Sequence, residues 1–324
     1  MFISKRKVKK RDYFYLEDRV FGKRISFFLG TRDKVEENIN QAFDSLIQQT
    51  AIENLRFSQK KFKINNLSLH ELLVLERLKI DYSLLKTFFP QEFESFKKDE
   101  FVRYAQGSAS VEGNSLTLQE ATLILSKKIS ISGKKIDEIR EIENMRFAAN
   151  ESKKIIDLNE RNIKRIHSAI MRGFNDKKPG EYRDGPIFIT GSSVKPPSAK
   201  KIPTKMKELL NWFNKNKEKI HPVELAAEFH ARFEEIHPFL DGNGRTGREI
   251  LNTILQKTNY PRAIINLENR QNYIILLERV QTNKEYNKFS KFIYLCLEKQ
   301  AQEINQAINE NKQHILKKLL KKTK

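Results

Sequence analysis

The residues best suited to chemistry lie in one stretch, residues 237–248, with the sequence HPFLDGNGRTGR. His237 stands at the end of an apolar-periodic helical segment, and an imidazole can take up a proton near neutral pH. Asp241 follows shortly after it, and a carboxylate can hold a divalent cation against a phosphate group. A base and a cation ligand this close together favour transfer of a phosphoryl or nucleotidyl group to a nucleophile.

The rest of the stretch is suited to binding an anion. Gly242, Asn243 and Gly244 form a short turn before the next helical segment. A helix that starts after such a turn presents unpaired backbone N–H groups and the positive end of its dipole. Arg245 and Arg248 add charge and forked hydrogen-bond donors at the same place. A solvated loop between two helices would explain the arginines, but it would not explain two glycines that flank an asparagine beside an acid and a base.

The stretch resembles the signature of the Fic family (Fic/Doc proteins), His-Pro-Phe-x-Asp/Glu-Gly-Asn-Gly-Arg-x-x-Arg, and it fills every fixed position. The resemblance implies a mostly helical fold and a protein adenylyltransferase, which moves AMP from ATP onto a protein hydroxyl. It also implies that His237 is the general base, that Asp241 is the Mg²⁺ ligand and that Arg248 meets the terminal phosphate of ATP. The residues that would form the anion hole are Gly242, Asn243, Gly244 and Arg245.

A second motif lies upstream, in the sequence SASVEGNSLTLQEATLIL. Its backbone pattern is ordinary, because Gly113 can end a helix in a left-handed cap and Thr117 with Glu120 can open the next helix as a capping box. The same stretch resembles the inhibitory motif of some Fic proteins, Ser/Thr-x-x-x-Glu-Gly/Asn. Ser108, Glu112 and Gly113 occupy its fixed positions.

A charge argument connects the two motifs. If the helix before Gly113 packs against the nucleotide site, the carboxylate of Glu112 can pair with Arg248. That carboxylate and the γ-phosphate of ATP would then compete for one guanidinium, so we expect a transferase autoinhibited by Glu112. The alternative, in which Glu112 only caps or solvates a helix end, predicts little change in activity when Glu112 is replaced.

A third feature interrupts the helical pattern at residues 179–197, where Ile187, Phe188 and Ile189 read as a short strand between glycines. An edge hairpin that connects two helices would account for it. In position and content the segment resembles the Fic flap, which holds the acceptor segment of the target protein by strand addition.

The elements that must position these motifs are predicted to be mainly α-helical. Residues 12–30 alternate aromatic or β-branched residues with polar ones, as in a β-hairpin. Apolar residues at three- and four-residue steps predict helices at 33–60, 69–89, 91–106, 137–157, 160–173, 202–217, 222–236, 268–282 and 285–310, with a further helix running from the signature to before Asn259. We therefore expect a Fic-type helical bundle with a flap and a small N-terminal unit. The expected domains are residues 1–98 (β-hairpin and helices), 99–310 (catalytic) and 311–324 (basic tail).

Composition adds limits to this interpretation. The formal net charge is +20, and residues 1–24 carry nine Lys/Arg against three acids while residues 311–324 carry six lysines and no acid. Such ends bind nucleic acid or stay solvated, and both readings are kept. No apolar run approaches the length of a membrane span, and the N-terminus does not read as a signal peptide, so we expect no membrane partner and a cytoplasmic location.

Two residues have plain alternatives to a chemical role. His230 shares a helical face with His237, but two histidines make no closed zinc site, so a buried packing residue is favoured. Cys296, the one cysteine, lies in an apolar helical stretch and reads as a core residue.

Alternatives to AMP transfer are also kept. Removal of AMP, with Glu112 placing a water molecule, and transfer of UMP would use the same site. The kinase variant has Lys at the second glycine of the signature, and Gly244 argues against it. A nucleic-acid-binding regulator with an inert core is less consistent with a complete signature. The expected cofactors are ATP and Mg²⁺, and the expected partner is a target protein with a Ser, Thr or Tyr hydroxyl; self-modification and a homodimer stay open.

Overall fold

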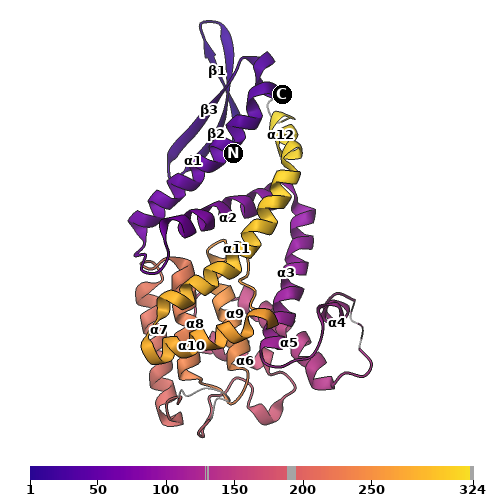
Figure 1. The fold of residues 1–324 in the computed structure, drawn as a ribbon, viewed down its shortest axis with the longest axis vertical. Helices are drawn as coiled ribbons and strands as arrows, with labels where there is room; N and C mark the ends of the chain where they lie inside the picture. The colour runs from indigo at the N-terminus through magenta and orange to yellow at the C-terminus, as the bar shows by residue number, and fades with distance from the viewer. Residues whose placement is uncertain (128, 130, 188–194, 322–324) are drawn as a thin grey trace. The chain divides into compact units, whose positions relative to one another are not determined.

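The computed structural model describes residues 1–127, 129, 131–187 and 195–321, and this part of the chain is mainly helical with one small sheet (Figure 1). The prediction of a mainly α fold is therefore confirmed. The chain divides into two compact units: residues 1–63 with 68–94 and 298–324, and residues 64–67 with 95–297. The domain boundaries expected at residues 98 and 310 stay a prediction. Within the described residues, none of the helices combines the length and the apolar character needed to cross a bilayer.

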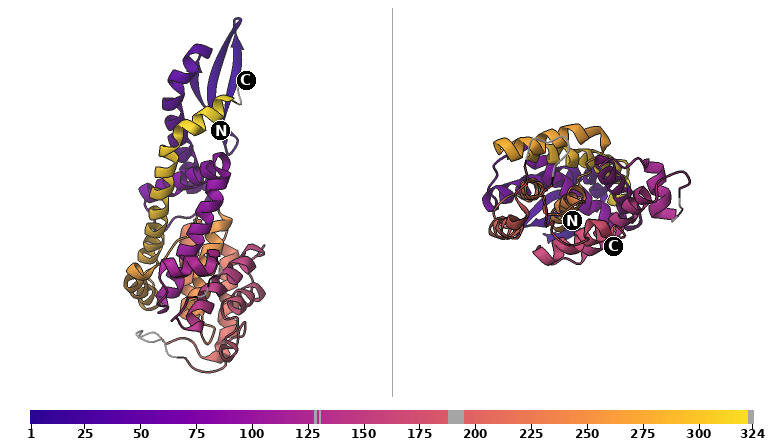
Figure 2. Two further views of the ribbon diagram at one scale, coloured as in Figure 1. Left: turned by 90° about the vertical axis from the view of Figure 1, so that its right-hand side faces the viewer. Right: turned by 90° about the horizontal axis from the view of Figure 1, so that it is seen from below.

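The first unit contains an antiparallel sheet in the order β1-β2-β3. Its strands are β1 (Phe2–Val8), β2 (Arg11–Val20) and β3 (Lys23–Gly30). Helix α1 (Val35–Lys61) covers one face of this sheet (Figures 1 and 2), where Leu16 and Leu29 are fully buried. The other helices are α2 (Leu69–Phe88), α12 (Lys312–Lys321) and the C-terminal part of α11 (Tyr286–Glu310).

The predicted β-hairpin at residues 12–30 is confirmed as β2 and β3, which are joined at Phe21 and Gly22. Strand β1 was not predicted. Its sequence, FISKRKV, pairs along its whole length with β2. The consecutive basic residues Lys5, Arg6 and Lys7 made it read as a charged terminus, because a largely solvated strand leaves only a weak apolar signal.

The second unit is a bundle of helices. Its elements are α3 (Pro90–Val111), α4 (Leu118–Thr122), a π-helical turn (Leu123–Lys127), α5 (Ile136–Lys153), α6 (Glu160–Ile170), α7 (Ile202–Asn216), α8 (Pro222–Ile236), α9 (Asn243–Lys257), α10 (Arg270–Asn283) and the N-terminal part of α11. These helices match the predicted positions closely, with one important difference in α3.

Helix α3 was predicted to end near Gly107, but it continues to Val111. Gly107 lies against the backbone of a distant loop, where an added Cβ would approach the carbonyl oxygen of Ile265 to 2.7 Å. The glycine therefore permits close packing instead of ending the helix. The extra turn of α3 carries Ser108 and ends directly before Glu112, so it positions the stretch that was expected to be inhibitory.

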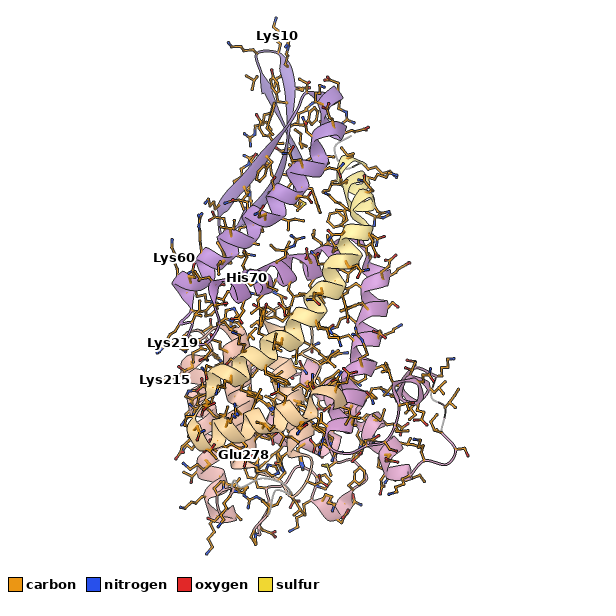
Figure 3. The ribbon with its side chains drawn as sticks, viewed as in Figure 1. Lys10, Lys60, His70, Lys215, Lys219 and Glu278 are labelled. Atoms are coloured by element: carbon orange, nitrogen blue, oxygen red, sulfur yellow. The ribbon has the colours of Figure 1, made fainter. Side chains whose placement is uncertain are left out.

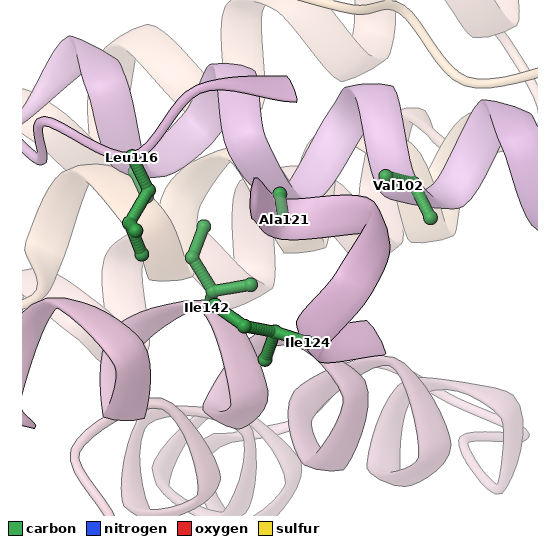
Figure 4. Close-up of a cluster of buried hydrophobic side chains, with 6 residues drawn as sticks. Val102, Leu116, Ala121, Ile124 and Ile142 are labelled. Atoms are coloured by element: carbon green, nitrogen blue, oxygen red, sulfur yellow. The ribbon is translucent and has the colours of Figure 1, made fainter. Parts of the chain in front are cut away.

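A buried apolar cluster supports the end of α3 (Figure 4). It joins α3, the Leu116 loop, α4, the following π-turn and α5, and its members are Val102, Ala109, Leu116, Ala121, Ile124 and Ile142. Thr117 and Glu120 form the predicted capping box at the start of α4. Gly113 has φ 103°, which confirms the left-handed end after α3. The cluster fixes where the turn after α3 can lie.

Candidate active site

The signature forms a tight loop between α8 and α9. His237 follows α8 with φ 49° and Gly242 precedes α9 with φ 71°. A left-handed conformation is unfavourable for a residue with a side chain, and such strain gathers at functional sites. The side chain of Asn243 holds the loop closed, since its Oδ1 accepts from the N–H of Phe239 and its Nδ2 donates to the carbonyl of Phe239, both at 2.9 Å.

Helix α9 packs closely on α8 at Gly247. A Cβ added there would lie 2.6 Å from Nδ1 of His230 and 2.7 Å from Oε1 of Glu234. The glycine thus lets the start of α9 approach the last turns of α8. This approach brings His237 and the N-terminus of α9 to one cavity.

His167, on α6, positions the signature loop from outside. Its ring stacks on Phe239 with the ring centroids 3.7 Å apart. Gly180 donates its N–H to Nδ1 at 2.9 Å, so Nε2 carries the proton and donates to the carbonyl of Asp241 at 2.9 Å. Burial lowers the pKa of His167 to about 4, which keeps this neutral tautomer at physiological pH. These contacts give His167 a structural role.

Arg183 holds the other side of the loop. Its N–H donates to Pro238 at 3.0 Å, and its Nε donates to the carbonyl of His237 at 2.9 Å. The two terminal nitrogens donate to the carbonyls of Gly185 and Pro197. One buried guanidinium therefore connects the start of the signature loop to backbone on both sides of the segment expected to form the flap.

That segment is described only in part. Ile187 is half-buried in irregular backbone, while Phe188 and Ile189 lie outside the described residues. The flap therefore stays a prediction.

His237 is the residue expected to act as the base. Its side chain is 18% exposed, and Nδ1 lies 3.6 Å from Oε2 of Glu234. Burial lowers the pKa of His237 to about 4 against the opposing effect of the Glu112 charge. The imidazole is therefore neutral at physiological pH, which is the form that accepts a proton.

Asp241 and Arg245 lie together at the start of α9. The Asp241 carboxylate accepts from the N–H of Gly242 at 2.6 Å and from Arg245 at 3.3 Å, and its side chain is 44% exposed. Arg245 is buried and also donates to Glu141 at 2.7 Å. Within the described residues there is no group of three or more metal-ligating side chains. Mg²⁺ usually takes only one or two carboxylates from a protein, and water and phosphate oxygens supply its other ligands. The exposed carboxylate of Asp241 fits such an ion.

Arg248 is fully buried and holds the stretch that was expected to be inhibitory. Its Nε donates to Oγ of Ser108 at 2.9 Å and its Nη2 donates to the carbonyl of Ser108 at 2.7 Å. Nη2 also donates to Oε1 of Glu112 at 2.8 Å, and Nη1 donates to the hydroxyl of Tyr273 at 3.2 Å. The ion pair expected between Glu112 and Arg248 is therefore present.

The Glu112 carboxylate lies directly against the start of α9. Its Oε1 is only 2.1 Å from the position that a Cβ would take at Gly244. Burial raises the pKa of this carboxyl, but Arg248 outweighs it and holds the pKa below its usual value. A carboxylate thus stands at the helix N-terminus that the sequence assigned to phosphate. Any side chain at position 244 would displace it.

These groups surround a cavity of about 180 Å³. Its wall consists of Val111, Glu112, Glu234, His237, Gly244, Arg248, Arg270, Tyr273, Ile274, Leu277, Glu278 and Gln281. Small-molecule sites usually measure roughly 300–1,000 Å³, so this cavity is small for a nucleotide. The carboxylate of Glu112 lies in the wall of this cavity beside Gly244.

Sequence reasoning missed several residues of the site. Burial raises the pKa of Glu234 to about 8, so a neutral carboxyl stands beside His237. Tyr273 bonds to both Arg248 and Nε2 of His230. His230 is thus a buried, hydrogen-bonded residue, as expected, and burial lowers its pKa to about 3. The signal for Glu234 was its position one helical turn before His237. No local signal marked Tyr273.

A neutral histidine, a helix N-terminus and a buried arginine line one cavity of the helical bundle. The family resemblance is confirmed by comparison, since residues 157–255 match the model of the Fic/DOC family. This match identifies a Fic/DOC domain in that part of the chain.

Two sets of known proteins are similar to this chain. Protein adenylyltransferase Fic of Drosophila yakuba and of Drosophila melanogaster are each 32% identical over 209 residues, which is 63% of this chain. The chain spans about two fifths of the length of these curated relatives. A Fic-domain-containing signalling protein from Bacteroides thetaiotaomicron has a TM-score of 0.66 and 25% identity, over 73% of this chain and 98% of the other. Fic-1 from C. elegans shares the fold, with a TM-score of 0.59 and 19% identity over 86% of this chain and 96% of the other.

Proposed function

We propose that this protein is an adenylyltransferase that moves AMP from ATP to a hydroxyl group of a target protein. The observation that carries the proposal is the position of neutral His237 at the same cavity as Gly244 and Arg248. The relatives named as protein adenylyltransferases support the reaction class. The curated relatives are longer than this chain, so its substrates and partners belong to the proposal.

In the proposed reaction, the target hydroxyl gives its proton to His237 while its oxygen bonds to the α-phosphorus of ATP. The bond from that phosphorus to the bridging oxygen breaks, and pyrophosphate leaves. The N–H groups at the start of α9 stabilise the charge of the phosphates, and Arg248 binds the terminal phosphate. Phosphate charge near His237 also raises its low pKa towards the range in which a base works well.

Asp241 is the residue that would hold Mg²⁺. When bound, the ion supplies neutralisation of phosphate charge. Asn243 contributes through its backbone, because its side chain is already bonded to Phe239 on both of its polar atoms. Arg245 supports Asp241 from the side and adds positive charge to the anion hole.

The proposal includes restraint by Glu112. Its carboxylate takes a donor of Arg248 and the space in front of Gly244, so ATP has to displace it to bind in line. Ser108 anchors the same guanidinium, and Gly113 allows the chain to turn away after α3. We also propose that the protein modifies itself, forms a homodimer and is cytoplasmic. The first two parts rest on the family resemblance, and the third rests on composition.

Removal of AMP from a modified protein is the second candidate. Glu112 favours it, because this carboxylate stands at the helix N-terminus beside His237 and could place a water molecule there. Transfer of UMP would use the same groups. Nucleotide choice therefore has to be tested directly.

The test is incubation of the protein with Mg²⁺ and labelled ATP or UTP, followed by mass spectrometry of the protein and of added candidate targets. We expect a mass increase of one AMP on a Ser, Thr or Tyr side chain, and its absence in His237→Ala. Incubation of the labelled product with fresh parent protein measures removal. Label that persists in His237→Ala at the parent rate would contradict the proposed chemistry.

A further inference from the structure

The sheet of the first unit has one face that α1 does not cover. Residues paired across the strands point to the same face of a sheet. Arg6 pairs with Tyr13, and Tyr15 pairs with Phe28. The inner face is buried, with Leu16 and its neighbours in the core. The outer face therefore displays aromatic and basic side chains together, and we call it the outer sheet face. It consists of Phe2, Ser4, Arg6, Val8, Arg11, Tyr13, Tyr15, Glu17, Arg19, Arg24, Ser26 and Phe28.

Three aromatic rings form the centre of this face. The ring of Phe28 lies 5.9 Å from Tyr13 and 5.3 Å from Tyr15, measured between centroids. Phe28 is 57% exposed although it lies in the middle of a strand. The guanidinium of Arg6 lies over the Tyr15 ring, 4.0 Å from its centroid. Tyr13 and Tyr15 are half-buried. An exposed ring beside two half-buried ones, with an arginine stacked on one of them, offers a flat surface to planar ligands.

The charge of the outer sheet face is positive, with four arginines against one carboxylate. Glu17 is fully buried and is neutralised by Arg6 and Arg24, which both donate to it. In the part of the chain that the structure describes, the side chains of Arg11 and Arg19 make no hydrogen bond or ion pair. Lys9 and Lys10 add charge at the exposed turn between β1 and β2, where Figure 3 labels Lys10. This face thus has the unpaired cations Arg11 and Arg19 beside the exposed ring of Phe28.

We propose that the outer sheet face binds single-stranded nucleic acid. Bases stack on aromatic rings whatever their sequence, while arginines meet the phosphates on either side. A sheet that presents neighbouring aromatic residues between basic ones is suited to unpaired bases, which a duplex keeps stacked inside. An acidic protein surface would use the arginines but would leave Phe28 without a role. The proposal is independent of AMP transfer, since none of these residues belongs to the signature.

The experiment measures binding of the full chain to fluorescein-labelled oligothymidine and oligouridine by fluorescence anisotropy at several salt concentrations. A duplex of the same length and a polyglutamate peptide serve as comparison ligands. We expect both single strands to bind about tenfold or more tightly than the duplex and the peptide. Comparison of the two single strands separates a preference for RNA from one for DNA.

Phe28 gives the decisive variants, because its exposure means that replacing it removes little from the core. Phe28→Ala and Phe28→Leu should weaken binding by about tenfold, while Phe28→Trp should keep it, since only the tryptophan restores a stacking surface. Phe147→Ala is the matched control, as Phe147 is an exposed aromatic residue on α5. It should leave binding unchanged.

A pair of double variants separates this face from net charge. Arg11→Ala with Arg19→Ala should reduce the slope of log K against log salt by about 0.7 for each lost phosphate contact. Lys215→Ala with Lys219→Ala removes the same charge from exposed positions labelled in Figure 3, and should leave that slope unchanged.

Three results would overturn the proposal. The first is no binding of either single strand at low salt, and the second is equal binding of the polyglutamate peptide or the duplex. The third is equal loss of affinity in the two double variants with no effect of Phe28→Ala, which would reduce the interaction to net charge.

Discussion

Replacement of Glu112 by glycine tests whether the ion pair between Glu112 and Arg248 restrains AMP transfer. The substitution removes the carboxylate that lies against Gly244 and that accepts from Nη2 of Arg248. Arg248 keeps its bonds to the hydroxyl and carbonyl of Ser108 and to Tyr273, so it should stay in place. The variant therefore frees a donor for the γ-phosphate of ATP without dismantling the site.

The size of the effect follows from the lost contact. A hydrogen bond to a charged group contributes about 1.5–3 kcal/mol, which corresponds to roughly 10–150-fold in an equilibrium. The Glu112 side chain is 39% exposed, so solvent weakens the pair and the lower half of this range applies. The lost contact thus sets a lower limit of about tenfold. Misplacement of the α-phosphate by about 1 Å can cost about 10²-fold in rate, which sets the upper limit. We therefore expect Glu112→Gly to raise the rate of AMP transfer by about 10–100-fold.

The assay compares initial rates of labelling of the protein, or of an identified target, at saturating Mg²⁺ and ATP. Glu112→Gln removes the charge with little change of shape, and should activate in the same direction while avoiding a glycine at the end of a helix. Glu278→Gln is a matched control, since Glu278 lines the same cavity and is labelled in Figure 3. Arg248→Ala should lower the rate in either background. Equal rates for the parent and both Glu112 variants would refute autoinhibition and leave Glu112 as a helix-end residue.

Three further predictions concern single groups. His237→Ala should lower the rate of transfer by about 10²–10⁴-fold while ATP binding, measured by calorimetry, largely survives, because the imidazole acts on the acceptor; labelling at the parent rate would remove it from the mechanism. Asp241→Ala should weaken Mg²⁺-dependent ATP binding as well as turnover, whereas equal activity with Mg²⁺ and with EDTA would contradict its role as metal ligand. The third concerns His230, whose pKa is about 3 in the folded protein against about 6.5 when unfolded, so the unfolded state binds more protons at pH values between these two. Its contribution to the free energy of unfolding is complete above pH 6.5 and falls as the pH drops towards 3. In urea unfolding, the free energy of unfolding of His230→Gln should therefore fall less steeply with decreasing pH than that of the parent. An identical dependence on pH in the two proteins would contradict the assignment.

The sequence predicted those parts of the site that are written in local patterns. Apolar periodicity located the helices, because one buried face leaves a 3.6-residue period whatever it packs against. The signature placed His237 before a helix start, and the opposite charges of Glu112 and Arg248 suggested their pairing. Strand β1 escaped the same reasoning because its basic face gives no apolar period.

Contacts between distant segments could not be predicted in this way. His167 bonds to Asp241 and Arg183 bonds to His237, and in each case the partners are more than fifty positions apart in the chain. Nothing in the composition around His167 or Arg183 marks these partners. Gly107 is the converse case. Its local sequence predicts the end of a helix, but glycine is needed there because the backbone at Ile265 lies too close for a side chain.

These distant contacts explain why the signature alone would not make a site. His237 is held in a left-handed conformation that an isolated loop would leave readily. Asn243 closes the loop from within, while Arg183 and His167 hold two of its carbonyls from outside. Each of these outer groups is buried and has its donors directed to backbone oxygens rather than to the cavity. The signature therefore supplies the groups that we propose to react, and residues outside it maintain the backbone geometry in which His237 and the N-terminus of α9 face the same cavity.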